Sequence, residues 1–153
     1  MFEAMTNAVE ELKRVDHLIY VSLKYTRTVD VIRSVINRIM DCYNAIIDGF
    51  LEKLEEDSKI TEIPQAPMLK VQEIKKHYPD DEVLIKNLDF YIFLRQLYRA
   101  DFERSGEFRK KVTMTSKVPG HGTLEITMVS VMEYYDQTKE FLHHVKDAYI
   151  ENE

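Results

Sequence analysis

The amino-acid sequence predicts an all-α fold, an antiparallel bundle of four long helices plus one short helix. Apolar residues recur every three or four positions in four long segments, which is the period of a helix with a buried face. Connections that contain proline or glycine separate these segments. With four glycines and four prolines in 153 residues, the chain has few of the turn residues that a sheet-rich fold needs. The length fits one domain, and we expect a single helical-bundle domain over residues 1–153.

The first two helices are expected over residues 3–24 and 29–56. Thr26 or Thr28 can cap the second helix, and Asp30 in its first turn suits the positive end of the helix dipole. This helix has a second row of apolar residues, so other helices must pack against it on more than one side. The helix is therefore predicted to lie at the centre of the bundle. Its main apolar stripe is Val29, Ile32, Ile36, Ile39, Tyr43, Ile46, Phe50 and Leu54.

The second half of the chain is predicted to contain one short and two long helices. Residues 60–67 cannot continue a helix because they include Pro64 and Pro67, and we interpret them as a surface crossing. A short helix over residues 68–77 follows. Pro79 and the acidic residues 80–82 mark the start of a long helix that continues to about Phe102. The last long helix is predicted over residues 123–149, where apolar residues again have helical spacing.

Residues 112–129 allow an alternative at the start of that last helix. The stretches 112–118 and 123–129 are rich in β-branched residues and flank a short segment with two glycines and a proline, as in a small hairpin. Leu124 and Met128, however, already fit the stripe of the helix that follows. The sequence favours the helix and leaves the hairpin open.

The charge distribution indicates where an anionic partner would bind. The net charge of −6 disfavours indiscriminate nucleic-acid binding, because the phosphate backbone attracts positive charge. Basic residues nevertheless gather in residues 24–38, near Tyr20 and Tyr25, and in residues 95–117. Such residues more often form an ordinary solvated surface, but cations with exposed aromatics are what single-stranded RNA contacts require. The candidate RNA or anion contacts are Arg95, Arg99, Arg104, Arg109, Lys110, Lys111 and Lys117.

The acidic tail is the alternative neighbour for this basic loop. Glu151 and Glu153 would neutralise the loop if the chain folded back on itself. The sequence does not choose between the tail and an external anion.

One spacing resembles a metal-binding motif. Glu140 and His143 have the Glu-x-x-His spacing that places a carboxylate and an imidazole one helical turn apart, as in di-iron bundles. Those sites need a second such motif and further glutamates, which the sequence lacks. Together with His144 and Asp147, these residues form a candidate weak metal site, for which the alternative is a solvated polar face. No cofactor is expected.

No set of residues defines a catalytic site. Cys42 has no sequence-defined partner, and the glycines form neither a P-loop nor a dinucleotide fingerprint. The sequence does not decide whether the protein is an enzyme, and it favours a protein without enzymatic activity. A metal-dependent helical-bundle enzyme stays an alternative.

The helical layout and the run Arg95-x-x-x-Arg99-Ala100-Asp101-Phe102 before the last helix resemble HEPN domains. That family consists of small helical bundles, commonly dimeric and often encoded beside nucleotidyltransferases in prokaryotic toxin–antitoxin systems. Its RNA-cutting members carry an arginine followed, after four to six residues, by a histidine. No histidine here has an arginine at that spacing, and Lys139 before His144 lacks the planar fork of arginine. The resemblance implies a non-catalytic interaction module with a nucleotidyltransferase as protein partner; RNA binding or cleavage is the alternative.

Two further expectations concern assembly and location. The helix over residues 29–56 has more apolar circumference than a small bundle covers, and Phe90 and Phe93 lie off the stripe of their helix, so we expect a homodimer. The first residues lack a secretory apolar run, and nowhere do about eighteen uncharged apolar residues occur together. We therefore expect a cytoplasmic protein with no membrane association.

Overall fold

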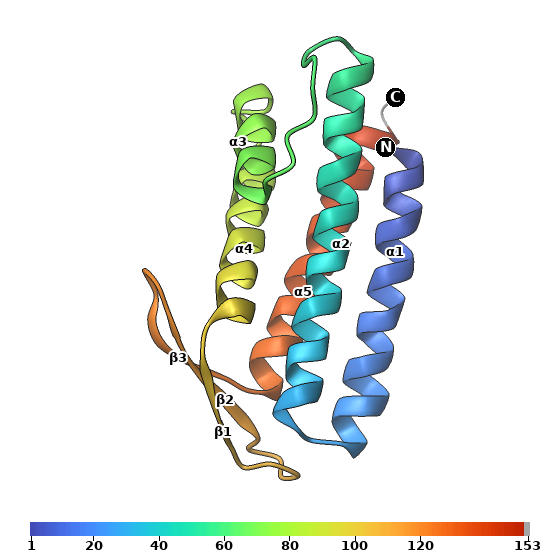
Figure 1. The fold of residues 1–153 in the computed structure, drawn as a ribbon. Coiled ribbons are helices and arrows are strands. Elements are labelled where there is room, and N and C mark those ends of the chain that lie inside the picture. The colour runs from blue at the N-terminus through green and yellow to red at the C-terminus, as the bar shows by residue number, and fades with distance from the viewer. Residues whose placement is uncertain (152–153) are drawn as a thin grey trace.

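Four long helices and a short one are present in the computed structural model, which describes residues 1–151. The long helices are α1 (Phe2–His17), α2 (Val29–Glu56), α4 (Glu82–Arg99) and α5 (Met128–Val145), and the short one is α3 (Pro67–His77). Two π-helical segments, η1 (Leu18–Leu23) and η2 (Lys146–Ile150), extend α1 and α5. Figure 1 shows the long helices side by side, with helices that follow one another in the chain running in opposite directions. Helices make up 69 % of the structure, which confirms its predicted helical character.

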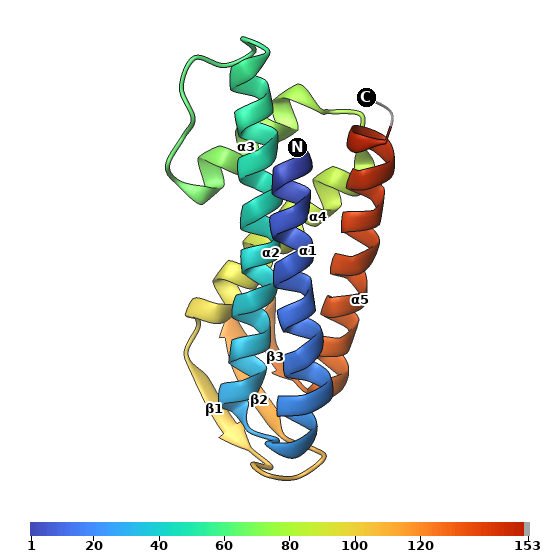
Figure 2. The same cartoon turned by 90° about the vertical axis from the view of Figure 1, so that its right-hand side faces the viewer.

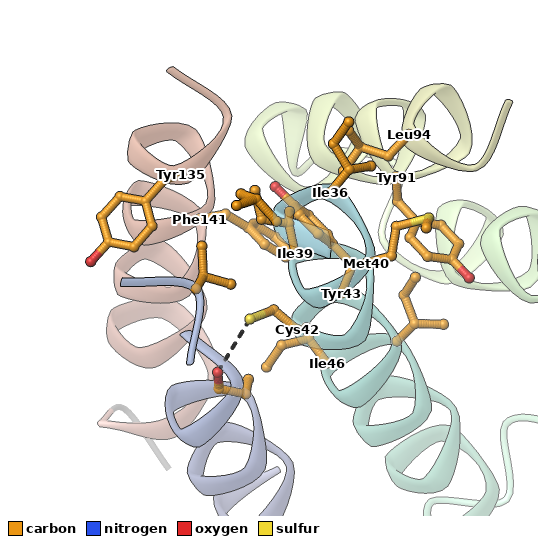
Figure 3. Close-up of a cluster of buried hydrophobic side chains, with 14 of the residues drawn as sticks. Ile36, Ile39, Met40, Cys42, Tyr43, Ile46, Tyr91, Leu94, Tyr135 and Phe141 are labelled. Atoms are coloured by element: carbon orange, nitrogen blue, oxygen red, sulfur yellow. Dashed lines mark hydrogen bonds between the residues drawn. The ribbon is translucent and has the colours of Figure 1, made fainter. Parts of the chain in front are cut away.

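The central position of α2 follows from its capping residue and its apolar residues. Thr28 Oγ1 accepts a hydrogen bond from the Val31 N–H at 3.2 Å, so Thr28 is the residue that caps the helix. Every residue of the predicted main stripe is buried, and α2 packs against α1, α4 and α5. Figure 3 shows the middle of this core, where the rings of Tyr43 and Phe141 stack with centroids 5.2 Å apart.

Gly49 allows α1 to approach α2 closely. A Cβ atom at this position would lie 2.4 Å from the Cβ of Ala4, which is far inside ordinary contact distance. Elsewhere along the same pair of helices, the Cys42 thiol donates a hydrogen bond to the Ala8 carbonyl oxygen at 3.4 Å (Figure 3). Burial raises the pKa of the Cys42 thiol to about 12, so this side chain is a packing group and not a nucleophile.

The all-α prediction is incomplete, because a three-stranded antiparallel sheet connects α4 to α5. Its strands are β1 (Phe102–Ser105), β2 (Thr113–Val118) and β3 (Gly122–Ile126), in the order β1-β2-β3. Strands β2 and β3 form the hairpin that residues 112–129 allowed, with Ser116 opposite Leu124. Strand β1 carries no sequence signal, because its four residues are mostly exposed and do not alternate between apolar and polar.

The sheet shifts two of the predicted helix boundaries. The helix expected to reach Phe102 ends at Arg99, because Ala100 has extended dihedral angles (φ −67°, ψ 148°) and Phe102 begins β1. The helix expected from residue 123 begins at Met128, where Thr127 and Ser130 form a capping box. Residues before Thr127 therefore belong to the sheet.

The sheet lies at the end of the bundle that is opposite to the chain termini (Figures 1 and 2). Met114, Ser116 and Val118 of β2 are buried, and β2 packs against α2 and α4. The intervening residue Lys117 is exposed. This alternation is typical of an antiparallel sheet with one covered face and one wet face.

Apolar residues that suggested a partner are covered within the chain. The ring of Phe90 lies 5.4 Å from that of Tyr134, and the ring of Phe93 lies 4.8 Å from that of His121. Phe90 and Phe93 therefore no longer argue for a homodimer, which stays a prediction. Within residues 1–151, no helix combines the length and the apolar character that a membrane crossing requires.

Candidate nucleic-acid interface

The turn between η1 and α2 meets the loop between β1 and β2 at the sheet end of the molecule (Figure 2). The Phe108 N–H donates to the Arg27 carbonyl oxygen at 2.6 Å. Beside this bond, Glu107 Oε2 accepts from the Val29 N–H at 3.2 Å, where a carboxylate suits the positive end of the α2 dipole. Contacts between residues 78 positions apart thus join the two basic segments of the sequence.

Arg104 anchors the base of the β1–β2 loop. Its guanidinium lies 2.9 Å from Asp30 Oδ1 and 3.3 Å from Glu107 Oε1. The same group lies over the ring of Phe102, with Cζ 5.1 Å from the ring centroid. Because its charge is paired inside the chain, Arg104 positions the loop and does not present a free cation.

Exposed aromatic rings and unpaired cations from both segments gather at this end. Tyr25 is 77 % exposed and Phe108 is 74 % exposed. The Lys24 ammonium lies 5.9 Å from the centroid of the Tyr25 ring. We call this surface the basic aromatic tip; its residues are Lys24, Tyr25, Arg27, Phe108, Arg109, Lys110 and Lys111. None of its cations forms an ion pair with a carboxylate of residues 1–151, so the charges are available to a ligand.

The backbone of Phe108 is strained. Its φ of 66° lies in the left-handed region, which costs an L-residue about 1–2 kcal/mol. Gly106 has the same φ, and a Cβ there would lie 2.8 Å from the Lys111 carbonyl oxygen, so the loop also requires a glycine. This tight loop directs the Phe108 ring outward at a cost in stability, a feature that is typical of binding sites.

The structure distributes the candidate anion contacts over several places. Arg109, Lys110 and Lys111 belong to the tip, and Arg104 is paired at its base. Arg95 and Arg99 line a separate groove on α4 with Met68 and Ile92. Lys117 lies on β2, where it lines a hollow with Phe102 and Thr123. The predicted basic zone of residues 95–117 is therefore not one surface.

Sequence reasoning missed the exposed aromatic residue of this loop, Phe108. Phe108 is a lone aromatic among charged residues, and it carries no periodic signal. Lys24, Arg27 and Tyr25 were recognised only as a separate basic segment, because nothing in the sequence pairs them with residues of the β1–β2 loop. The weak signal that was present is Gly106, which marks a turn two residues before Phe108.

Glu151 of the acidic tail does not neutralise the tip. Glu151 Oε1 lies 3.6 Å from the Lys146 ammonium, at the end of the bundle opposite to the sheet (Figure 1). Glu153 lies outside the described residues. Glu151 is therefore not the anion that neutralises the basic loop.

The candidate metal residues do not converge on one point. His143 Nε2 lies 3.3 Å from Asp147 Oδ2, whereas His144 Nε2 lies 2.9 Å from Asp81 Oδ2 on another element. Glu140 is exposed. Throughout residues 1–151, no group of three or more histidine, cysteine or acidic side chains is arranged to hold a metal ion.

Asp81 links the start of α4 to the C-terminal end of the bundle. Its Oδ1 accepts from the Leu84 N–H at 3.0 Å, and its carboxylate accepts from His144 Nε2 and from the Tyr149 hydroxyl. Burial alone would raise the pKa of Asp81, but the hydrogen bonds from Tyr149, His144 and Leu84 outweigh it, so this pKa is lowered. The carboxylate is fully engaged within the chain, as expected of a structural link.

No protein-family model, no curated protein and no solved structure matches this chain. The function is therefore argued from the geometry, and the resemblance to HEPN domains stays a prediction.

Proposed function

We propose that this protein binds single-stranded RNA through the basic aromatic tip and does not cut it. The observation that carries the proposal is the convergence, from distant parts of the sequence, of two exposed aromatic rings with unpaired cations. Both kinds of group are needed for single strands, since bases stack on aromatic rings and phosphates pair with cations.

The electrostatics favour binding confined to the tip. The chain as a whole has a net charge of −6, so at long range the molecule repels a phosphate backbone. Tyr25 and Phe108 offer stacking that contributes about 1–3 kcal/mol per base, and this supplies affinity that does not depend on salt. A short single strand with unstacked bases fits this combination better than a duplex, because the bases of a duplex are already stacked.

Binding without cleavage follows from where the histidines lie. His121 contacts Phe93, and His143 and His144 pair with Asp147 and Asp81. None of the five histidines belongs to the tip, so the tip has no imidazole for general acid–base catalysis on a phosphodiester.

The same proposal includes the interaction module that the HEPN resemblance implies. A helical bundle that binds RNA at one end leaves its long helical faces for a protein partner such as a nucleotidyltransferase. A nucleotidyltransferase gene beside the gene for this chain would support that partner.

RNA binding is tested by fluorescence anisotropy with a labelled 5′-hydroxyl single-stranded RNA over a series of salt concentrations. Binding is expected to weaken with salt, and replacing Arg109, Lys110 and Lys111 together by glutamine should reduce the slope of log K against log salt by about two units. Phe108→Ala should lower affinity about tenfold and leave the slope unchanged, because it removes stacking and no charge.

The matched control replaces Lys59, Lys76 and Lys86 by glutamine, since these exposed lysines lie outside the tip and the charge change is the same. A control variant that loses as much affinity as the tip variant would contradict the proposal, as would absence of binding at low salt. Vesicles of anionic phospholipid provide a further arm. Tip-dependent binding to vesicles without binding to RNA would assign the surface to a membrane instead.

A further inference from the structure

A second cationic site lies on α4, away from the residues of the tip. Ile92, Arg95, Gln96 and Arg99 have the spacing of one helical face and line a groove of about 250 Å³. The opposite wall is formed by the start of α3 and the residue before it, Ala66, Pro67 and Met68. The groove therefore combines guanidinium groups with an apolar wall.

The guanidinium of Arg95 lies at the end of a partly buried hydrogen-bond chain. Arg95 Nη1 donates to the Tyr91 hydroxyl at 3.5 Å, and that hydroxyl donates to Asn44 Oδ1 at 2.5 Å. Tyr91 is only 2 % exposed, so this support comes from the core. A cation held in this way loses little side-chain freedom when a ligand binds.

The charge of the groove is uncompensated. Neither Arg95 nor Arg99 forms an ion pair with a carboxylate of residues 1–151, unlike Arg104, which is paired with Asp30 and Glu107. Adjacent guanidinium groups repel each other, and a ligand with two negative charges would neutralise both.

We propose that this groove binds a phosphate monoester carried on a small carbon body such as a sugar. A phosphate monoester carries nearly two negative charges at neutral pH and presents several acceptor oxygens, which suits two arginines better than a carboxylate does. Met68, Ile92 and Pro67 supply the apolar surface for the carbon body. The volume lies below the roughly 300–1,000 Å³ of drug-sized pockets, so the groove holds a phosphate and the small body next to it, and any longer ligand would extend out of it.

The proposal is tested by isothermal titration calorimetry with ribose 5-phosphate. Arg95→Gln and Arg99→Gln are each expected to weaken binding at least about tenfold, because each removes charge-assisted hydrogen bonds. Tyr91→Phe is expected to weaken binding less, since Tyr91 only positions Arg95. Ribose without phosphate should not bind.

Two controls separate this site from the tip. Lys86→Gln removes one charge from an exposed position of the same helix, and it should bind ribose 5-phosphate like the unmodified chain. The variant with glutamine at positions 109, 110 and 111 should also bind it normally. The proposal for this groove and the proposal that the tip binds RNA can therefore be contradicted independently of each other.

Two further measurements identify the anion and its source. Affinity should fall as the pH drops below about 6, where the phosphate dianion takes up a proton and becomes a monoanion. Tighter binding of a 5′-phosphorylated than of a 5′-hydroxyl oligonucleotide would identify the end of an RNA strand as the source, and equal binding would identify a free sugar phosphate. No binding of ribose 5-phosphate, equal binding by the Arg95 and Arg99 variants, or equally tight binding of propionate would overturn the proposal.

Discussion

Phe108 combines a strained backbone with an exposed ring. Its φ of 66° costs stability, and its side chain, 74 % exposed, gains little from burial in return. Glycine would adopt this backbone conformation freely, whereas alanine would keep the strain. The comparison of these two substitutions therefore isolates the backbone contribution.

We expect Phe108→Gly to be more stable than Phe108→Ala by about 1 kcal/mol in urea unfolding, since only glycine relieves the left-handed strain. Val129, which is 65 % exposed in the first turn of α5, is the matched control site. There the order should reverse, because glycine is the poorer helix former. The same order at both positions would contradict the strain at Phe108.

Between elements, Asp81 joins α4 to the C-terminal helical segments through His144 and Tyr149. The pKa of Asp81 is lowered in the folded state, so the folded chain binds its proton less tightly than the unfolded chain does. The stabilisation is therefore complete above the unfolded pKa of about 3.9 and is lost as the pH falls through the folded pKa.

Asp81→Asn is expected to lower the free energy of unfolding by roughly 1 kcal/mol at neutral pH, because asparagine still caps α4 but loses the charge. The difference should shrink below about pH 4, where the protonated aspartic acid resembles asparagine. Urea unfolding from about pH 3 to 7 measures it.

Asp80→Asn is the control at the neighbouring position, because Asp80 is exposed. It should change stability little at any pH. A constant difference between Asp81→Asn and the unmodified chain across the whole pH range would show that the carboxylate charge is not what stabilises the link.

For the molecule as a whole, the homodimer prediction now depends on apolar side chains that remain exposed. Phe2 is 76 % exposed on α1, Tyr20 is 53 % exposed on η1, and Val129 and Met132 are exposed on α5. A partner would remove this area from water. Light scattering at micromolar concentration should therefore give twice the chain mass of 18.1 kDa. A single species at the mass of one chain, unchanged on concentration, would contradict it.

The sequence also predicted much of the core correctly. The apolar stripe of α2 is buried throughout, because residues three and four apart share one helix face whatever the rest of the fold does. The boundary at Glu56 and the short helix ending at His77 agree with the structure. The errors lie between Arg99 and Met128. The strands there are too short to show a clear alternation of apolar and polar residues, and Leu124 fits the helical period as well as the strand period.

The candidate site was predicted less completely than the core. Arg109, Lys110 and Lys111 were identified as an anion-binding candidate, and they are exposed and unpaired within the described chain. Arg104 belongs to the same basic stretch of the sequence, but it is paired with Asp30. The sequence alone cannot distinguish a paired arginine from an unpaired one. His143 and His144 are adjacent in sequence but pair with different carboxylates, because neighbouring helical residues point in different directions.

The sequence by itself determined the long helices, the central place of α2 and the excess of acid over base, because these depend on local periodicity and composition. Only the tertiary structure decided that Arg27 meets Phe108, that Arg104 is neutralised, and that Arg95 and Arg99 line a groove of their own. The contacts at the tip depend on where the chain returns after 78 positions, and the groove depends on how α3 meets α4; both are set by the packing of the whole bundle and its sheet.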